Sequence, residues 1–306
     1  MKKNFYFIKL ITVCCLISIS FIHIVKADDL FRIEEINSST YCIYVYLSKG
    51  AVLKPFVGNA VDASVGKYEE LTVKQFSSKK ELTDAILLVS GTFHDDAGKP
   101  SFPIKIDGNI ATYGFERNIE GNPMLMIRNS EKRAYIGKYN RSNFEGDSIA
   151  PDVVVGLDKY YNKRPSDYTG RNYVGLKDPY NNAYGTVVFL VSSSLTQMKA
   201  REFLKNRGCP LDQIMQLDGS STSQFSHKTY GSWTHQISTG RQMPQIFAVF
   251  SGNSSSCSAG KIMDCNNKCV SELTVNRWLG DGVCDQYSYF DINCSKFNYD
   301  NGDCDN

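Results

Sequence analysis

The sequence shows no large excess of charge of either sign. Its 306 residues contain 34 Lys and Arg against 32 Asp and Glu. Proteins that bind nucleic acid usually present a clear basic surplus to the phosphates, and this chain has none. We therefore expect no nucleic-acid partner.

Long apolar runs are also scarce. Beyond residue 27 none could cross a bilayer, and the early run Leu10–Val25 follows the basic start Met1-Lys2-Lys3. This pattern is typical of a secretory signal peptide, here residues 1–27 with cleavage near Ala27. An uncleaved membrane anchor is the alternative. We expect a secreted or periplasmic, extracytoplasmic protein with no stable membrane span after cleavage.

Internal repeats, low-complexity tracts and the G-x-S-x-G nucleophile motif are absent. Without that motif, and without a marked acid or base partner, Ser221 is a poor candidate for a nucleophile. Residues 28–252 are long enough for one large domain. The short polar stretch 253–256 is expected to be a linker that separates this domain from residues 257–306.

Runs rich in Val, Ile, Phe and Tyr recur through residues 28–252 and predict strands. They are Tyr41–Leu47, Ala85–Val89, Asp152–Val155, Thr186–Val191, Ile214–Leu217 and Gln245–Phe250. Helices are predicted at Lys79–Ala85 and at Leu195–Arg207, where apolar residues recur at helical spacing and Gly208 stands as the C-cap. This alternation predicts an α+β main domain with a mixed sheet, few helices and at least one crossover connection.

Cysteine is concentrated at the end of the chain. Six of the ten cysteines are Cys257, Cys265, Cys269, Cys284, Cys294 and Cys304. So short a segment cannot bury enough apolar surface to fold unaided, and disulfides or a hard cation bound by carboxylates are the usual remedies. We expect residues 257–306 to form a small, disulfide-rich, calcium-binding module.

The runs Asp281-Gly282-Val283-Cys284-Asp285 and Asn298-Tyr299-Asp300-Asn301-Gly302-Asp303-Cys304 resemble a Lin-12/Notch repeat. The resemblance implies a structural calcium ion on Asp281, Asp300 and Asp303, with Asp285 as a spare ligand, and a disulfide between Cys284 and Cys304. The upstream cysteine spacing departs from the repeat, so the other pairings stay open. The alternative is a disulfide knot whose acidic residues only face solvent.

Two further cysteines, Cys42 and Cys209, lie in the main domain. In an exported protein they form either a disulfide or a pair of buried thiols, and the sequence leaves both possibilities open.

A second motif follows the predicted helix 195–207. The apolar run Ile214–Leu217 leads to Asp218 and then to a loop of small residues, Gly219-Ser220-Ser221-Thr222. Such a turn is by itself more often only a turn, but open α/β sheets present ligand-binding groups at the carboxyl ends of their strands. Asp218 is therefore the candidate catalytic carboxylate.

Residues 152–250 resemble the phosphodiester glycosidase family. Leu217–Phe225 aligns without gaps with the family's L-D-G-G-G-S-T-Q-M, and further matches are Val153–Gly156, Arg171–Gly175, Gly240–Pro244 and Phe247–Phe250, with weaker ones at Leu88–Phe93 and Gly98–Pro100. The sequence departs from the family at Ser220 and Ser221, which replace glycines, at Ser90, which replaces Asn, and at His94, which replaces Phe.

The resemblance implies an exported hydrolase that releases a sugar, similar to N-acetylglucosamine, from a sugar-1-phosphodiester. Asp218 would stabilise the oxocarbenium-like centre or activate water, and Arg171 and Arg241 would hold the phosphate. The implied substrate-binding residues are Gly219, Ser221, Thr222, Ser90 and Thr92, and His94, His227 and His235 are candidate proton shuttles. The expected partner is a phosphorylated glycan or sugar phosphate.

A second function remains open. Serines in place of the loop glycines would crowd a ligand that approaches the backbone closely. A catalytically degenerate member that binds surface glycans, or another surface partner, is the alternative to the enzyme.

Overall fold

The computed structural model describes residues 24–25, 30–146, 150–161, 165–180, 183–229, 231–252, 261–265, 269–287, 290–293 and 297–304. Most of the expected signal peptide and the expected linker 253–256 lie outside these residues. The short strand β1 (Ile24–Val25) pairs with β2 (Phe31–Asn37). Among the described residues, no helix is long and apolar enough to span a membrane.

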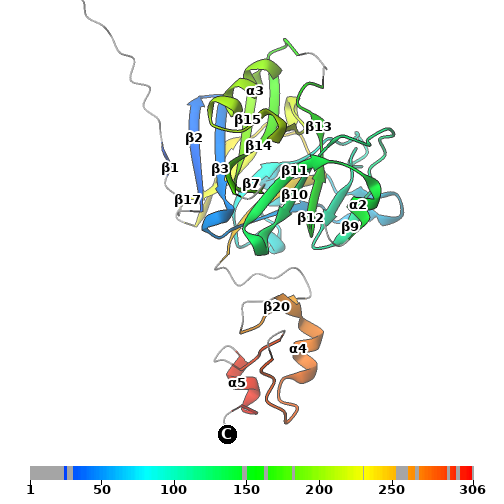
Figure 1. The fold of residues 1–306 in the computed structure, drawn as a ribbon, viewed down its shortest axis with the longest axis vertical. Helices are drawn as coiled ribbons and strands as arrows, with labels where there is room; N and C mark the ends of the chain where they lie inside the picture. Colours follow the sequence, from blue (N-terminus) through cyan, green and yellow to red (C-terminus); the bar gives the residue numbers. More distant parts are fainter. Residues whose placement is uncertain are drawn as a thin grey trace, which may run out of the picture.

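The main domain contains a large and a small sheet (Figure 1). In the large sheet, neighbouring strands follow the order β1, β2, β3 (Thr40–Tyr46), β15 (Ala183–Leu195), β11 (Arg133–Lys138), β10 (Pro123–Arg128), β12 (Asp152–Val155), β8 (Ile104–Ile106) and β9 (Asn109–Thr112). Three more strands branch from β15. Strand β14 (Thr169–Tyr180) pairs with β15, β16 (Ile214–Gln216) pairs with β14, and β13 (Leu157–Asp158) pairs with β16. The small sheet runs β18 (Ser232–Ile237), β17 (Phe225–Thr229), β7 (Ala85–Ser90), β19 (Gln245–Ser251) and β4 (Ala51–Val57).

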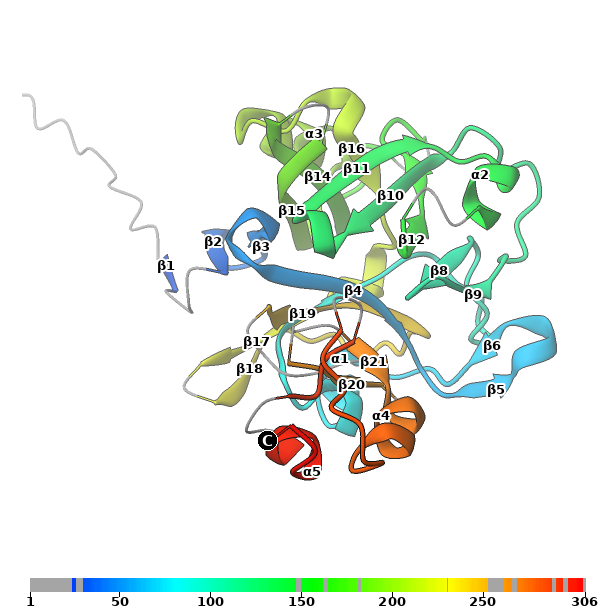
Figure 2. The same cartoon turned by 60° about the horizontal axis from the view of Figure 1, so that its bottom comes forward.

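The two sheets share one core. Side chains from β3, β14 and β15 of the large sheet meet side chains from β4, β7 and β19 of the small sheet, and they include Phe189 and Phe247, whose ring centroids are 5.1 Å apart. In Figure 2, strands β10, β11, β14 and β15 of the large sheet lie above β4, β17, β18 and β19 of the small sheet. Along each strand, alternate side chains point into this core. The two sheets bury one face each against the other, and the main domain is therefore a β-sandwich.

The expected α+β class with a mixed sheet is wrong, because the described residues are mostly β-strand and the helices among them are few and short. Every pair of neighbouring strands in the described residues is antiparallel. The expected crossover exists. Strand β14 is antiparallel to both β15 and β16, so β15 and β16 run in the same direction. Helix α3 lies in the segment that connects β15 to β16 across β14. Because β14 lies between them, the crossover produces no parallel pair, and the sheet is not mixed.

Short helices cover the outer faces of the sheets. Helix α3 (Gln197–Asn206) begins where the Thr196 side chain accepts a hydrogen bond from the backbone N–H of Lys199, and it ends before Gly208, whose φ is 87°. This matches the predicted helix, and Ala200 and Leu204 pack on the outer face of β14 and β15. The other predicted helix, Lys79–Ala85, is shorter than expected. Only the 3-10 turn η3 (Lys80–Leu82) forms there, and the strand β7 begins at Ala85.

The remaining elements of the main domain are short. They are η1 (Leu47–Lys49), β5 (Ala60–Asp62), η2 (Ala63–Val65), β6 (Lys67–Tyr68), α1 (Val73–Phe76), η4 (Asn129–Glu131), α2 (Arg141–Glu145), η5 (Leu211–Gln213) and η6 (Ser220–Thr222). Helix α1 and the turn η3 pack on the outer face of the small sheet, whereas α2 packs against β10 and β12.

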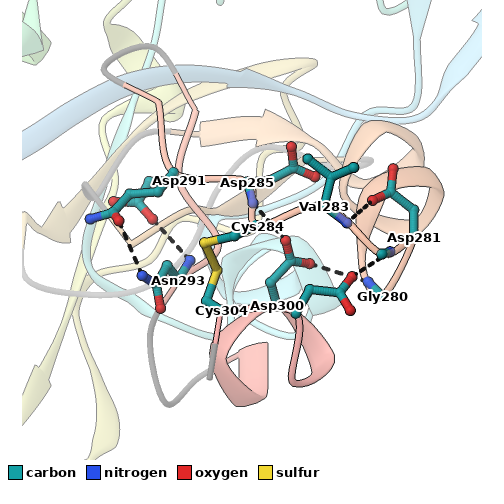
Figure 3. The surroundings of a disulfide bond; sticks show 12 residues. Gly280, Asp281, Val283, Cys284, Asp285, Asp291, Asn293, Asp300 and Cys304 are labelled. Atoms are coloured by element: carbon teal, nitrogen blue, oxygen red, sulfur yellow. Dashed lines mark hydrogen bonds between the residues drawn. A yellow bond between two sulfur atoms is a disulfide. The ribbon is translucent and has the colours of Figure 1, made fainter. Parts of the chain in front are cut away.

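The C-terminal residues form a small cluster of their own. It contains β20 (Lys261–Met263), β21 (Cys269–Ser271), α4 (Glu272–Trp278) and α5 (Asn298–Asn301), around the buried side chains of Val275, Phe290, Ile292 and Phe297. The disulfide between Cys284 and Cys304 is confirmed (Figure 3). Cys265 and Cys269 each take part in a disulfide as well. Cys257 and Cys294 lie outside the described residues.

Several of the described acidic residues of this cluster bond to backbone N–H groups. Within the described ranges, no group of three or more His, Cys, Asp or Glu side chains is placed to hold a metal ion. The carboxylates instead accept backbone N–H groups: Asp300 from Gly280 at 3.2 Å and Asp285 at 2.8 Å, Asp303 from Gly282 at 2.7 Å and Asp281 from Val283 at 3.0 Å (Figure 3). The calcium-binding character expected of the module is thus not shown, and calcium stays a prediction.

Candidate functional site

The loop after β16 passes from the large sheet to the small one. It starts at Asp218 and leads into β17, so that Asp218 lies where the ends of β16 and β7 meet. The backbone N–H of Asp218 donates to the carbonyl oxygen of Gly91, just after β7, at 3.2 Å. Its own Oδ1 accepts the N–H of Gly219 at 2.8 Å. Asp218 is thereby fixed by both sheets at one end of the sandwich.

The small residues after Asp218 form a tight turn against β14. Ser220 has φ 59°, in the left-handed region that favours glycine. A Cβ at Gly219 would be only 2.6 Å from the carbonyl oxygen of Gly170. Thr222 is buried, and its hydroxyl donates to the Gly219 carbonyl, whereas Ser220 and Ser221 are exposed.

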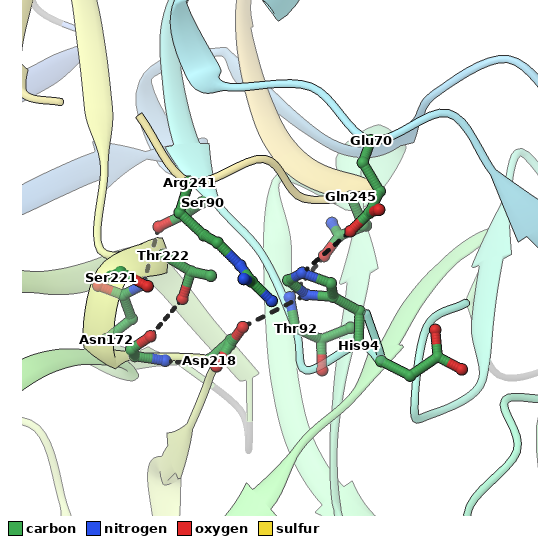
Figure 4. A network of polar contacts seen from close by, with 12 residues as sticks. Glu70, Ser90, Thr92, His94, Asn172, Asp218, Ser221, Thr222, Arg241 and Gln245 are labelled. Carbon is green, nitrogen blue, oxygen red and sulfur yellow. Dashed lines mark hydrogen bonds and ion pairs between the residues drawn. The ribbon is translucent and has the colours of Figure 1, made fainter. Parts of the chain in front are cut away.

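An imidazole lies between two carboxylates at this end of the molecule (Figure 4). Nδ1 of His94 is 3.3 Å from Oδ2 of Asp218, and Nε2 of His94 is 3.6 Å from Oε1 of Glu70. The His94 side chain is 2% exposed, against 17% for Asp218 and 24% for Glu70. Neither ring nitrogen has a hydrogen bond of good geometry, so these contacts are ion-pair distances rather than aligned hydrogen bonds.

Charged groups surround this trio. Burial raises the pKa of Glu70, with Asp95 and Asp96 acting in the same direction and His94 and Arg241 against it. The guanidinium of Arg241 donates to Asp96 at 2.5 Å, and both side chains are exposed, 44% for Arg241 and 91% for Asp96. The ion pair with Asp96 raises the pKa of Arg241, and the carboxylates of Glu70 and Asp218 add to this effect. Arg241 therefore lies within electrostatic range of both carboxylates.

Ser90, Asn172 and Gln224 form a buried network beside Asp218. Asn172 donates to the Ser90 hydroxyl at 2.8 Å, and the Gln224 backbone N–H donates to it at 3.2 Å. The Gln224 side chain donates to the Arg241 carbonyl at 2.5 Å. Ser90 is fully buried, so its hydroxyl connects Asn172 to the Gln224 backbone beneath the exposed part of the site.

Thr92 and the neighbouring Gly91 are fixed by the start of β19. The Thr92 N–H donates to the side chain of Gln245 at 2.7 Å, and its hydroxyl donates to the carbonyl of Val155 at 3.0 Å. A Cβ at Gly91 would lie 1.7 Å from the Gln245 side-chain oxygen and 2.8 Å from the Gln245 backbone oxygen, so the position favours glycine.

The structure does not bring Arg171 to Asp218. Arg171 and Asn172 are adjacent on β14, so their side chains point to opposite faces of the sheet. Asn172 reaches Ser90 and the site, whereas Arg171 donates to the carbonyls of Leu195 at 3.2 Å and Asp167 at 3.3 Å. Its guanidinium thus joins the segments on either side of β14, and burial lowers its pKa.

Of the three histidines proposed as proton shuttles, only His94 contacts Asp218. His227 and His235 lie on β17 and β18. The His235 ring bonds the Ser226 hydroxyl at 2.6 Å, and His227 packs against the rings of Phe31 and Phe225. Burial lowers the pKa of both histidines.

Two cavities lie away from Asp218. One of about 440 Å³ is lined by residues of η2, β9 and the following turn, including Lys99, Thr112 and Tyr113. A neighbouring one of about 390 Å³ is lined by Tyr113, Tyr139 and Arg141, among others. The candidate site itself is partly open to solvent, since the side chains of Asp218 and Glu70 are 17% and 24% exposed.

Two participants were missed in the sequence. Glu70 lies in a short segment before α1 with no motif around it, and only the fold brings it to His94. Asn172 lies in the stretch Arg171–Gly175, where the sequence analysis assigned a role to Arg171 and none to Asn172. Its signal was the alternation of a strand, which places one of two neighbouring residues on the inner face.

Comparison with known proteins supports the fold. No protein-family model matches the sequence, and no curated protein matches it. The structure is similar to a hypothetical protein from Synechocystis, with 8% identity and a TM-score of 0.48, over 75% of this chain and 64% of that one. It is also similar to the catalytic domain of zebrafish N-acetylglucosamine-1-phosphodiester alpha-N-acetylglucosaminidase, auto-inhibited by its pro-peptide, with 12% identity and a TM-score of 0.50, over 76% of this chain and 82% of that one. The second similarity shows a phosphodiester glycosidase-like fold.

Proposed function

We propose that this chain is an exported glycosidase that hydrolyses a sugar-1-phosphodiester, with a sugar similar to N-acetylglucosamine. The observation that carries the proposal is the placement of Asp218. It is a partly exposed carboxylate, fixed by both sheets, in a fold similar to that of a catalytic domain whose name records the cleavage of such a bond.

The chemistry requires little more than one fixed carboxylate and a cation. The glycosidic C–O bond breaks, its electron pair leaves with the phosphomonoester, and water adds to the anomeric carbon and loses a proton. A phosphomonoester is a good leaving group, so protonation contributes less than for an alcohol. Asp218 would face the positive charge that develops on the sugar, or accept the proton of the attacking water.

Arg241 is the residue that would hold the phosphate. Its present partner, Asp96, is almost fully exposed, and exposed ion pairs contribute only about 0 to 1 kcal/mol. A phosphate that entered between them would accept two parallel hydrogen bonds from the guanidinium at little cost. Arg171, held by backbone carbonyls on the other face of β14, is not assigned this role.

The alternative is a protein that binds such glycans without cleaving them. The observation in its favour is the turn Ser220–Thr222, where Ser220 occupies a left-handed conformation and presents an extra side chain beside Asp218. If these side chains crowd the substrate, Ser220→Gly with Ser221→Gly should raise turnover, whereas in an active wild type it should change turnover little.

The test is a hydrolysis assay with a panel of sugar-1-phosphodiesters in ¹⁸O-labelled water. The proposal predicts ¹⁸O in the released sugar and none in the phosphomonoester, because water attacks the anomeric carbon. Label in the phosphomonoester would identify a phosphodiesterase instead. Binding of a substrate without any release would leave the glycan-binding alternative.

A further inference from the structure

His94 is almost closed off from solvent, although both of its neighbours are reachable. Its side chain is 2% exposed, whereas Asp218 and Glu70 keep 17% and 24% exposure. A substrate can therefore contact the carboxylates but not the imidazole. A role of His94 in catalysis would therefore act through one of these two carboxylates, and Asp218 is the candidate catalytic one.

The two contacts of the ring are on opposite nitrogens. Nδ1 faces Asp218 and Nε2 faces Glu70, so the ring connects two segments that are far apart in the sequence (Figure 4). A neutral imidazole carries one N–H and can donate to one of the two carboxylates only. A protonated imidazole carries two and can donate to both.

Charged groups on other segments also act on this trio. They include the carboxylates of Asp95 and Asp96, from the turn after His94, and the guanidinium of Arg241. Only the imidazole stands between two carboxylates with one ring nitrogen toward each. This arrangement suits a ring with two N–H groups, which has a donor for each carboxylate.

We propose that His94 is a positioning residue for Asp218, and that it acts in its protonated form by donating to Asp218 and Glu70 together. Resting on the proposed hydrolysis at Asp218, this role has two consequences. The positive ring pairs with the Asp218 carboxylate, and the bond to Glu70 holds the ring, and through it the carboxylate, in one orientation. Both nitrogens lack a well-aligned partner here, and such contacts often shorten only when the substrate is bound.

The experiment compares His94→Phe, Glu70→Gln and a matched control, His227→Phe, which removes another buried imidazole on β17. We expect kcat to fall about 10- to 100-fold in His94→Phe, with KM changed less than about threefold, because the carboxylate loses its orientation rather than its contact with substrate. The wild-type rate should fall on the alkaline side of the pH profile, and this limb should be absent in His94→Phe. Glu70→Gln should shift the limb to lower pH, and the control should keep the wild-type profile.

A second measurement does not depend on turnover. Ring ¹⁵N signals of His94, assigned by their loss in His94→Phe, report its charge. At the pH where the wild-type ring is half protonated, the ring should be mainly neutral in Glu70→Gln and in Asp218→Asn. An unchanged charge in both variants, or an unchanged alkaline limb in His94→Phe, overturns the role of His94. A wild type without turnover, but with the expected change of ring charge, overturns the hydrolase and leaves the pairing of His94 intact.

Discussion

The carbonyl oxygen of Ser220 lies against the Cα of Gly170, so closely that a Cβ at residue 170 would be 1.7 Å from it. Gly170 is part of β14, and Ser220 belongs to the turn that follows Asp218. The absence of a side chain on one strand of the large sheet therefore sets the position of the loop that carries the candidate catalytic carboxylate.

Gly170→Ala should displace this loop. We expect a loss of stability of about 1 to 3 kcal/mol from overpacking, together with a fall in kcat, because Asp218 moves with the turn. The control is Gly137→Ala on β11, where a Cβ would meet only the flexible end of Met126. Thermal melting and the hydrolysis rate check both effects. Wild-type melting and activity in Gly170→Ala would show that the loop does not depend on this contact.

Cys42 and Cys209, which the sequence left as a disulfide or two thiols, are both free and buried. They pack in the same cluster beneath α3, and burial raises the pKa of each to about 12. Neither should react with iodoacetamide in the folded protein at pH 8, and both should react after unfolding, which mass mapping measures. A Cys42–Cys209 linked peptide in the non-reduced protein would contradict this arrangement.

Asp152 should make stability depend on pH. It is buried, it accepts the Asp107 N–H at 2.9 Å, and burial raises its pKa to about 7. The unfolded chain releases this proton near pH 4, so the folded state binds the extra proton between about pH 4 and 7, and stability falls as pH rises through this range. The loss is on the order of 4 kcal/mol at most, from a pKa difference of about three units.

Asp152→Asn removes the titrating group while keeping its shape. The fall in stability between pH 4 and 7 should then be smaller than in the wild type, as measured by urea unfolding at several pH values. Asp212→Asn, at an exposed position in η5, is the control and should retain the wild-type slope. An equal slope in all three proteins would remove Asp152 as its source.

The C-terminal cluster should depend on Asp300. Its carboxylate is fully buried and accepts two backbone N–H groups. Asp300→Asn turns one acceptor into a donor that faces an N–H, and such a loss costs about 1 to 3 kcal/mol. In a Trp233→Phe background, the fluorescence of Trp278, which packs on Phe290, reports the melting of this cluster alone.

The same signal tests calcium. Melting with and without a chelator should differ if Asp281, Asp300 and Asp303 bind the ion, as the repeat-like sequence predicts. Identical curves would remove calcium and leave the disulfides and the N–H contacts as the stabilising elements.

Local patterns located the elements of this fold, but not their partners. The strand Asp152–Val155 and helix α3 were predicted closely, because alternation, helical spacing and a terminal glycine are local signals. The direction of strand pairing is not local. The helix between β15 and β16 suggested a mixed sheet, and only the insertion of β14 between them makes the neighbours antiparallel.

In the candidate site, too, local patterns identified some residues, and only the fold identified the others. Asp218 was found because its strand and turn are contiguous in the sequence. Glu70 and His94 come together only through the fold. Arg171 and Asn172 could not be told apart by a motif that contains both, since the inner face of β14 is set by packing against the small sheet.

The most direct test of the account is the rate at which wild type and Asp218→Asn release sugar from an N-acetylglucosamine-1-phosphodiester under identical conditions. The exchange keeps the shape of the side chain and removes its charge. We predict hydrolysis by the wild type and a rate about 100- to 1,000-fold lower in the variant, with little change in melting temperature. Equal rates in the two proteins, or no hydrolysis by either, would contradict it.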